Sequence, residues 1–388
     1  MLRSTRFEVD LGLVAHNFRL VRERLKAGPP ARDGAPPRIC AVLKGNAYGL
    51  GALAAAGELL AAGAHMLAVA CLTEALELRG QFPTAAILVM GHTPTEYLAE
   101  CARARLRTTL FDLEQARALS EASVQLERRT PVFVKIDAGM NRLGIKPDQH
   151  TAALIAEMAG LEGIRLEGLF TQLPYREPGS DHACFQVFRQ VAGEAEAAGV
   201  RFPIHSASES LAVLRHPEFA LDLVRVGALL FGVEPRGIPL PGIRTPFALR
   251  SRISRLRALR EGEGVSYDSS WRAREGSRIA TVPAGYADGY CRRLSNQAQA
   301  VVRGRRVPVV GLVTMDQLFL DVSGLPECRE GDEVLLLGRH GEDEVGVAEV
   351  ADWAGLHRNE VLSMVGRRVP RLYLKNGKVV GEADYLVG

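Results

Sequence analysis

Short apolar runs alternate with helix-like patterns over roughly the first 230 residues. Eight runs have the length and composition of buried strands, at 39–43, 66–70, 86–90, 106–110, 131–136, 166–170, 201–205 and 222–226. Seven of the eight gaps between or after them carry apolar residues at helical spacing. This alternation predicts a (β/α)8 TIM-type barrel. A doubly wound open sheet stays as the alternative, although no GxGxxG phosphate fingerprint follows the first strand.

The pattern changes after Pro241 to short alternating strands separated by tight turns. Strands are expected at 247–259, 277–282, 300–302, 307–310, 318–322, 333–337 and 372–374, with helical intervals at 348–355 and 358–364. We therefore predict a barrel domain over residues 1–244 and a mainly β C-terminal domain over 245–388. Residues 1–10 include a strand-like segment at 7–10 that could pair with the second domain.

Composition excludes several classes of function. The chain has 388 residues, 47% of them hydrophobic, and a formal net charge of +3, so no nucleic-acid or other acidic polymer partner is implied. Six cysteines without a CxxC pair favour a reducing compartment, and no disulfide framework or metal site is expected. No apolar stretch is long enough to span a bilayer, and residues 1–10 do not resemble a signal peptide. We expect a cytoplasmic protein with no membrane partner.

Candidate chemistry lies at the ends of the predicted barrel strands, where barrel sites form. Lys44 ends the first strand, and burial there would let its amine lose a proton and attack a carbonyl. Arg142 follows the fifth strand in a glycine-rich loop, and His205 ends the seventh. Arg225 ends the eighth and precedes a small-residue turn that could bind phosphate. A reactive lysine with a phosphate site after the last strands suggests pyridoxal phosphate.

The segment Val42-Leu-Lys44-Gly-Asn46-Ala-Tyr48-Gly49-Leu-Gly51 resembles the pyridoxal-phosphate attachment signature of alanine racemases. Seven further motifs match that family in the same order, at 73–79, 137–144, 224–227, 264–267, 283–289, 315–317 and 368–371. The resemblance covers nearly the whole chain. It implies a barrel plus a β domain in a head-to-tail homodimer, with pyridoxal 5'-phosphate as an aldimine on Lys44.

The resemblance also implies roles for individual residues. Lys44 and Tyr267 would be the two bases on opposite faces of the substrate, with Tyr267 and Met315 reaching the partner subunit's site. The cofactor would be bound by Lys44, Tyr48, His205, Ser208, Arg225, Gly227 and Ala228. The substrate side of the site would include Arg142, Tyr286, Met315 and Asp316. Lys135 matches a lysine that is often carbamylated in the family.

Three positions depart from the family pattern. Gln172 stands where a histidine is usual, and Arg367 replaces an occasional tyrosine. Glu209 lies where a serine normally approaches phosphate, so we expect its carboxylate to turn away or bridge through another group. Ser208 or Ser210 could then supply the missing hydroxyl.

The leading hypothesis is a pyridoxal-phosphate-dependent alanine racemase that supplies D-alanine for peptidoglycan. Two alternatives remain open. One is a racemase for serine, lysine or a broad range of amino acids, because side-chain selectivity depends on few contacts. The other is a cofactor-binding homologue without turnover, although both proton-transfer residues are present.

Overall fold

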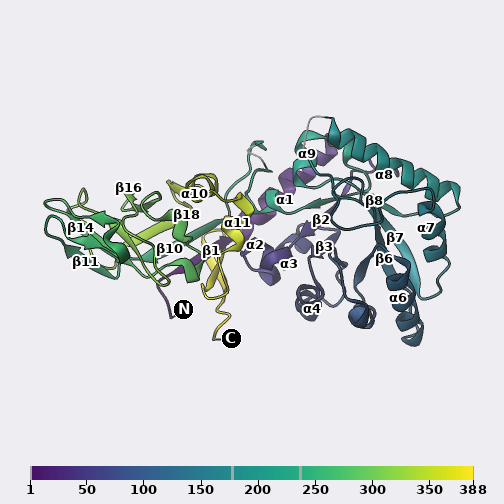
Figure 1. Ribbon diagram of the computed structural model, residues 1–388, viewed down its shortest axis with the longest axis horizontal. Helices are drawn as coiled ribbons and strands as arrows, with labels where there is room; N and C mark the ends of the chain where they lie inside the picture. The colour runs from purple at the N-terminus through teal and green to yellow at the C-terminus, as the bar shows by residue number, and fades with distance from the viewer. Residues whose placement is uncertain (1, 176–178, 236–237, 388) are drawn as a thin grey trace.

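The computed structural model describes residues 2–175, 179–235 and 238–387. Figure 1 shows an elongated molecule with two lobes, a barrel surrounded by helices at one end and a β-rich lobe at the other. The barrel lobe carries most of the helices, and the last strands of the chain lie in the β-rich lobe.

Eight parallel strands form the barrel and lie side by side in the order β8-β7-β6-β5-β4-β3-β2-β9. Their bounds are β2 (Arg38–Val42), β3 (Met66–Val69), β4 (Ile87–Val89), β5 (Arg107–Leu110), β6 (Thr130–Lys135), β7 (Ile164–Phe170), β8 (Ile204–Ser206) and β9 (Leu223–Val226). Between β8 and β9 the gap is bridged by backbone bonds, from Asp222 N to His205 O (3.1 Å) and from Arg225 N to Ser208 O (3.0 Å). The prediction of a (β/α)8 barrel is confirmed, and the barrel is nearly closed.

Helices connect the barrel strands and cover their outer faces (Figure 1). They are α1 (Leu11–Lys26), α3 (Ala52–Ala61), α4 (Leu72–Gln81), α5 (Leu98–Arg103), α6 (Leu113–Gln125), α7 (Thr151–Ala159), α8 (Ser180–Ala197) and α9 (Ser210–Arg215). Short 3-10 helices stand at η1 (Thr95–Tyr97), η2 (Pro217–Phe219) and η3 (Ala228–Phe231). Aspartates begin two of the long helices: Asp10 accepts from Leu13 N (3.1 Å) and Asp112 from Gln115 N (2.8 Å).

The second lobe is built mainly from one eight-stranded sheet, ordered β16-β15-β18-β10-β1-β20-β21 with β19 beside β18. These strands are β1 (Arg6–Asp10), β10 (Phe247–Arg252), β15 (Gln299–Val302), β16 (Arg305–Pro308), β18 (Glu333–His340), β19 (Asp343–Val345), β20 (Arg371–Lys375) and β21 (Lys378–Ala383). The first strand of the chain thus lies between β10, antiparallel to it, and β20, parallel to it.

Smaller elements complete this lobe. A three-stranded sheet contains β11 (Arg255–Ala258), β14 (Arg278–Val282) and β17 (Leu318–Asp321), and β12 (Gly264–Val265) pairs with β13 (Trp271–Arg272). Between the strands lie α10 (Val347–Ala354), α11 (Arg358–Ser363) and the 3-10 helices η5 (Tyr267–Ser269), η6 (Tyr286–Asp288) and η7 (Arg292–Leu294). The prediction of a mainly β second domain agrees with this architecture.

The run at 247–259, expected as one strand, is two strands in different sheets. β10 ends at Arg252, Ile253 is buried in the core, and β11 begins at Arg255 beside β14. Arg250 on β10 is 7% exposed and donates to Glu8 Oε1 (2.8 Å) and Glu333. Glu8 lies on β1, more than 200 positions from Arg250, so the local sequence pattern could not reveal this pair.

Across the part of the chain that the structure describes, no helix combines the length and apolarity needed to cross a membrane. The six cysteines are free thiols, three of them buried.

Candidate active site

The lysine predicted to be reactive lies in a backbone turn of uncommon shape. After β2, the segment α2 (Lys44–Tyr48) turns with left-handed geometry, and Gly45, Asn46, Ala47 and Tyr48 all have φ between 54° and 64°. Non-glycine residues in this region cost about 1–2 kcal/mol each, so surrounding contacts must hold the turn.

Contacts from both lobes hold this turn. The Glu74 carboxylate accepts from Gly45 N (2.6 Å), and the Asn46 side chain accepts from Ala52 N (2.8 Å) and donates to Tyr385 Oη (3.1 Å). Arg371, which is fully buried, donates twice to Gly49 O (3.0 and 2.7 Å). Because Arg371 lies on β20, the C-terminal lobe helps to fix the direction of Lys44.

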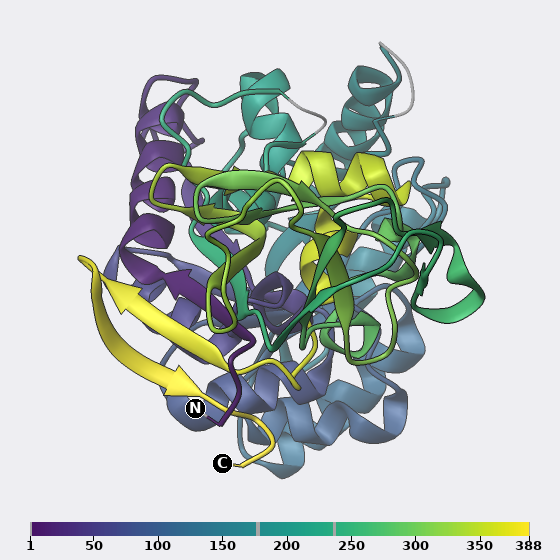
Figure 2. The ribbon, with the colours of Figure 1, turned by 90° about the vertical axis from the view of Figure 1, so that its left-hand side faces the viewer.

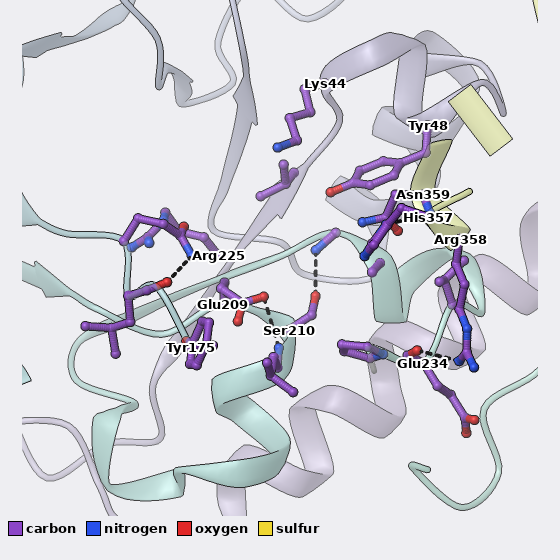
Figure 3. A pocket seen from close by; sticks show the side chains of 18 of the residues that line it. Lys44, Tyr48, Tyr175, Glu209, Ser210, Arg225, Glu234, His357, Arg358 and Asn359 are labelled. Atoms are coloured by element: carbon purple, nitrogen blue, oxygen red, sulfur yellow. Dashed lines mark hydrogen bonds between the residues drawn. The ribbon is translucent and has the colours of Figure 1, made fainter. Parts of the chain in front are cut away.

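Lys44 faces a cavity of about 640 Å³ at the carboxyl ends of the barrel strands. Figure 3 shows Lys44 and Tyr48 on one side and Arg225, Glu209 and Ser210 across the cavity from them. Its further lining includes Met140, Arg142, Gln172, Tyr175, Gly227, Ala228, His357, Arg358 and Asn359. The sequence-predicted residues Lys44, Tyr48, Arg142, Arg225, Gly227 and Ala228 are therefore brought together.

Arg225 is 4% exposed and rigidly held. Its Nη1 donates to Ser206 O (3.0 Å) and Ser206 Oγ (2.6 Å), and its Nη2 donates to Thr171 O (2.6 Å). Its guanidinium also lies over the Phe170 ring, 5.3 Å from the centroid. These three bonds leave two of the five N–H donors of the guanidinium for a group in the cavity.

The cations of the cavity lower one another's affinity for protons. Burial lowers the pKa of Lys44, and the charges of Arg142 and Arg225 lower it further, against the opposing effect of Glu209 and Glu74. Burial also lowers the pKa of Lys135 to about 8, assisted by Arg225 and Arg142. Both amines therefore lose a proton more readily than an ordinary lysine, as a nucleophile or a general base requires.

The loop that carries Arg142 is fixed by a single carboxylate. Asp137 accepts from the backbone amides of Gly139 (3.1 Å), Asn141 (2.9 Å) and Arg142 (2.9 Å). Although burial alone would raise it, these backbone hydrogen bonds lower the pKa of Asp137. Arg142 reaches the cavity from this loop, and within residues 2–175, 179–235 and 238–387, which the structure describes, its side chain forms no ion pair.

Tyr48 and Gly227, the residue just before η3, form a close contact. A β-carbon on Gly227 would lie 2.4 Å from Tyr48 Oη, so the tyrosine packs directly against the glycine and any other residue there would clash. Gly227 N donates to Ser210 Oγ (3.2 Å), and the backbone of Ala228 follows directly. A phenol, a serine hydroxyl and backbone N–H groups thus converge on one small region, which suits an anion such as phosphate.

Two of the residues that depart from the family pattern, Glu209 and Gln172, line the cavity. Glu209 caps α9 with its own carboxylate, which accepts from Leu211 N (3.0 Å) and Ala212 N (3.3 Å). This agrees with the expectation that Glu209 engages another group. Gln172 donates weakly to Leu173 O (3.4 Å) and can exchange no proton in this position.

Three other positions do not reach the cavity. His205 packs outside the barrel against Phe188 of α8, where burial and Arg32 lower its pKa to about 4. Ser208 is fully buried behind the lining, and it is Ser210 that faces the cavity. Arg367 pairs with Glu77 (3.4 Å) and lies over the Tyr385 ring. The roles inferred for His205 and Ser208 therefore lack structural support. The alternation of side chains along β8 turns His205 outwards, and Ser208 lies beyond the end of that strand.

The remaining predicted residues form a second group on the C-terminal lobe. Tyr267, Tyr286 and Met315 are 71%, 41% and 53% exposed. Tyr286 N and Ala287 N donate to Thr314 O and Met315 O (both 3.0 Å), and Ser266 Oγ donates to Leu312 O (2.7 Å), so the three loops adjoin. Asp316 is bound by Arg368. In one chain, this group does not line the Lys44 cavity.

Sequence analysis missed several lining residues. His357, Arg358 and Asn359 enter the cavity from the start of α11, where Arg358 donates to Glu234 O (3.1 Å) (Figure 3). The local sequence offered only a polar triplet at the start of the helical interval expected at 358–364. Tyr175 was also missed, and burial with Glu209 nearby raises its pKa.

Together, the fold and the cavity define a (β/α)8-barrel enzyme. Its first barrel strand, β2, is followed by a lysine that faces a cavity lined by further cationic side chains. Residues 9–235 match the family described as alanine racemase, N-terminal domain, and residues 247–373 match alanine racemase, C-terminal domain. The chain therefore belongs to the alanine racemase family, and it is an isomerase with alanine racemase activity.

Individual relatives agree with this assignment. The chain is 40% identical to an alanine racemase of Desulfovibrio desulfuricans, over 95% of this chain and 97% of the relative. It is 39% identical to one of Symbiobacterium thermophilum, over 96% and 97%. Among solved structures, alanine racemase of Clostridium difficile 630 has a TM-score of 0.93 at 31% identity, with both chains fully covered. That of Bacillus anthracis with bound L-Ala-P has a TM-score of 0.90 at 31% identity, covering 100% of this chain and 99% of the other.

Proposed function

We propose that the cavity binds pyridoxal 5'-phosphate covalently on Lys44 and that the chain interconverts L- and D-alanine with Lys44 and Tyr267 as its two bases. The observation that carries this proposal is the position of Lys44. It lies on a left-handed turn that is fixed by contacts from both lobes, and it faces Arg225 across a cavity lined by cations. When bound, the cofactor supplies an electron sink that makes the substrate's α-proton acidic.

The residues of the cavity fit that cofactor. Tyr48, Ser210 and the backbone at Gly227 and Ala228 would bind the phosphate, and the absence of a side chain on Gly227 lets Tyr48 approach this region closely. Arg225 would face the pyridine nitrogen. Because its guanidinium remains charged and donates hydrogen bonds, it would discourage a proton on that nitrogen.

This choice of partner has a chemical consequence. With Arg225 in that position the α-proton would return quickly, which would disfavour side reactions such as transamination. The buried bonds from Arg225 to Ser206 and Thr171 keep the guanidinium from moving away.

Two bases are required because the proton leaves one face of the α-carbon and returns on the other. Lys44 would serve the D face, and its lowered pKa suits it to accept a proton. Tyr267 would serve the L face from the partner subunit of a head-to-tail homodimer. Its exposure in the single chain and the positive φ of Ser266 (65°) and Asp268 (59°), which project the loop, support this role.

Substrate contacts would come from both subunits. Arg142 would orient the cofactor's phenolate or Tyr267, Met315 of the partner's loop would contact the substrate carboxylate through its backbone, and Asp316 and Tyr286 would line the approach. Lys135 lies next to these cations, and its lowered pKa makes the neutral amine, the form that reacts with carbon dioxide to give a carbamate, more accessible than in an ordinary lysine.

A direct experiment tests the assignment. The purified protein, incubated with pyridoxal phosphate and reduced with borohydride, should carry the cofactor on the peptide that contains Lys44. With L-alanine in deuterated water it should exchange the α-proton and form D-alanine. A panel of single L-amino acids serves as the control: turnover of only serine or lysine would contradict the assignment to alanine, and no turnover of any would contradict a racemase.

We further propose that the product supplies peptidoglycan synthesis in the cytoplasm. The six free cysteines, of which Cys71 is exposed, support a reducing compartment.

A further inference from the structure

A second group of ionisable side chains lies outside the cavity, between α8 and the segment after α9. His182 Nε2 is 3.1 Å from Glu218 Oε1, and His216 Nδ1 is 3.3 Å from the same oxygen. The ligand-capable atoms of His182, His216 and Glu218 all lie within 4.8 Å of one another. None of the three residues lines the cavity around Lys44.

The spacing of these atoms suits a zinc ion. Zinc binds histidine nitrogen and carboxylate oxygen at about 2.0–2.2 Å in tetrahedral sites, which places neighbouring donor atoms about 3.4 Å apart. The separations of 3.1 and 3.3 Å are close to that value. Two histidines with one glutamate are also a donor set that zinc uses in proteins, with a fourth position for water.

A buried carboxylate provides an independent observation. Asp181 is 3% exposed, and its Oδ1 has no hydrogen-bond partner among residues 2–175, 179–235 and 238–387. Its Oδ2 lies 3.5 Å from Nε2 of His216, the ring nitrogen that faces away from Glu218. Metal-bound histidines commonly donate their second N–H to a carboxylate, which fixes the tautomer and orients the ring.

The charges of this group also call for a cation. Both ring nitrogens of His216 face carboxylates, Nδ1 towards Glu218 and Nε2 towards Asp181. A neutral ring has only one N–H, so one nitrogen of a neutral ring presents its lone pair to a negative charge, and either a second proton or a metal ion on Nδ1 removes that conflict. A metal ion on Nδ1 leaves the N–H on Nε2 for Asp181.

We propose that His182, His216 and Glu218 form a zinc site and that Asp181 is the positioning residue that orients His216. The side chains of His182 and Glu218 are 54% and 48% exposed, which gives the ion a path from solvent. The site would join the start of α8 to η2.

The site would act on the walls of the cavity from outside. Tyr175 and Gln172, which line the cavity, lie on the connection between β7 and α8. Glu209 and Ser210 begin α9, and His216 follows the end of that short helix. A bound ion would therefore tie together the two segments that carry these lining residues, without touching the reacting atoms. The inference does not depend on the proposed function.

Binding of Zn²⁺ alone to the chelator-treated full chain, measured by calorimetry, tests the proposal. The wild type should bind one ion per chain at this site. His182→Ala, a change at an exposed side chain, should weaken binding at least tenfold. Asp181→Asn keeps all three ligands and should still weaken it by about 10–100-fold, as the loss of an outer carboxylate partner does. His340→Ala is the matched control, because His340 faces a single carboxylate, that of Glu8 at 3.6 Å.

A second readout does not depend on calorimetry. Excess zinc should raise the unfolding temperature of the wild type and the His340→Ala variant, and should raise that of His182→Ala much less. Equal affinity in the wild type and His182→Ala would overturn the site, as would the absence of saturable binding. Zinc affinity unchanged by Asp181→Asn, in a variant with a native circular dichroism spectrum, would overturn the role of Asp181.

Discussion

Lys135 is a buried amine whose lowered pKa makes the stability of the folded chain depend on pH. It is 6% exposed, its Nζ lies 5.4 Å from the centroid of the Phe170 ring, and the guanidinium of Arg225 lies over the same ring. Burial, together with Arg225 and Arg142, lowers its pKa to about 8 in the folded chain. In the unfolded chain the value is about 10.4. Between these values the unfolded chain binds more protons, so the free energy of unfolding rises with pH across this window.

Lys135→Met removes this titration. Relative to wild type, the free energy of unfolding of the variant should be highest near pH 7. This difference should shrink by up to about 3 kcal/mol towards pH 10.5. Denaturant unfolding of the cofactor-free protein at both pH values measures the change. The exposed Lys146→Met is the matched control. A difference between Lys135→Met and wild type that stays constant from pH 7 to 10.5 would contradict the lowered pKa.

Tyr267 offers a clean test of the second base. Its side chain is 71% exposed in the chain, so Tyr267→Phe should leave the fold intact. Loss of the phenol removes a proton donor and acceptor, and we expect racemisation to fall by about 10²–10⁴-fold in both directions. Cofactor absorbance should persist. Tyr97→Phe, at another exposed tyrosine, should keep wild-type rates, and equal rates for Tyr267→Phe would remove Tyr267 from the mechanism.

Some site residues were predictable from sequence because position along a strand determines them. Lys44 and Arg225 stand at the carboxyl ends of strands, where side chains leave the packed interior. His205 has the same position, but the alternation of its strand directs it outwards while Ser206 faces Arg225. The sequence does not reveal which of two neighbouring strand residues faces inwards. Arg358 was missed because it comes from the other lobe.

At the scale of elements, the lysine turn depends on a close fit with β20. An added β-carbon on Gly51, whose φ is +109°, would lie 1.9 Å from Tyr373 Oη. Gly51→Ala should therefore both strain the backbone and displace Tyr373, which lies two residues from Arg371. We expect a loss of stability clearly above the 1–2 kcal/mol of backbone strain alone, measured by denaturant unfolding.

Gly276→Ala separates these two effects. Gly276 has φ +77° and nothing within 4 Å of the added carbon, so this variant carries only the backbone strain. Adding Tyr373→Phe to Gly51→Ala should recover part of the excess loss, because the hydroxyl is the nearest atom. Equal destabilisation by Gly51→Ala and Gly276→Ala would show that the contact with Tyr373 has no effect.

The barrel strands were easier to predict than those of the second lobe. Strands such as β2, β3, β4 and β9 are short, mostly apolar runs that are almost entirely buried, which gives a strong local signal. β12 and β13 have two residues each, and β21 is mostly exposed, so their patterns carry little information. The division of residues 247–259 between two sheets depends on distant partners, Glu8 and Thr281 among them.

At the scale of the whole molecule, the proposed site needs two chains. A mixture of Lys44→Ala chains and Tyr267→Phe chains should regain activity, since a mixed dimer pairs an intact Lys44 with an intact Tyr267 in one of its two sites. Random exchange would restore about a quarter of the sites. Refolding or co-expression followed by a D-alanine assay measures this recovery. Two residues acting within one chain would give no recovery above the separate variants.

The place of β1 has a consequence for biosynthesis. This strand is made well before its neighbours β10 and β20, which appear on the ribosome only after some 240 and 360 further residues. The large sheet therefore cannot be completed until β20 has been synthesised, and until then β1 keeps an unpaired edge. Both ends of the chain finish on the same lobe (Figures 1 and 2), so a permuted gene that joins them and opens elsewhere could deliver β1 directly after β21.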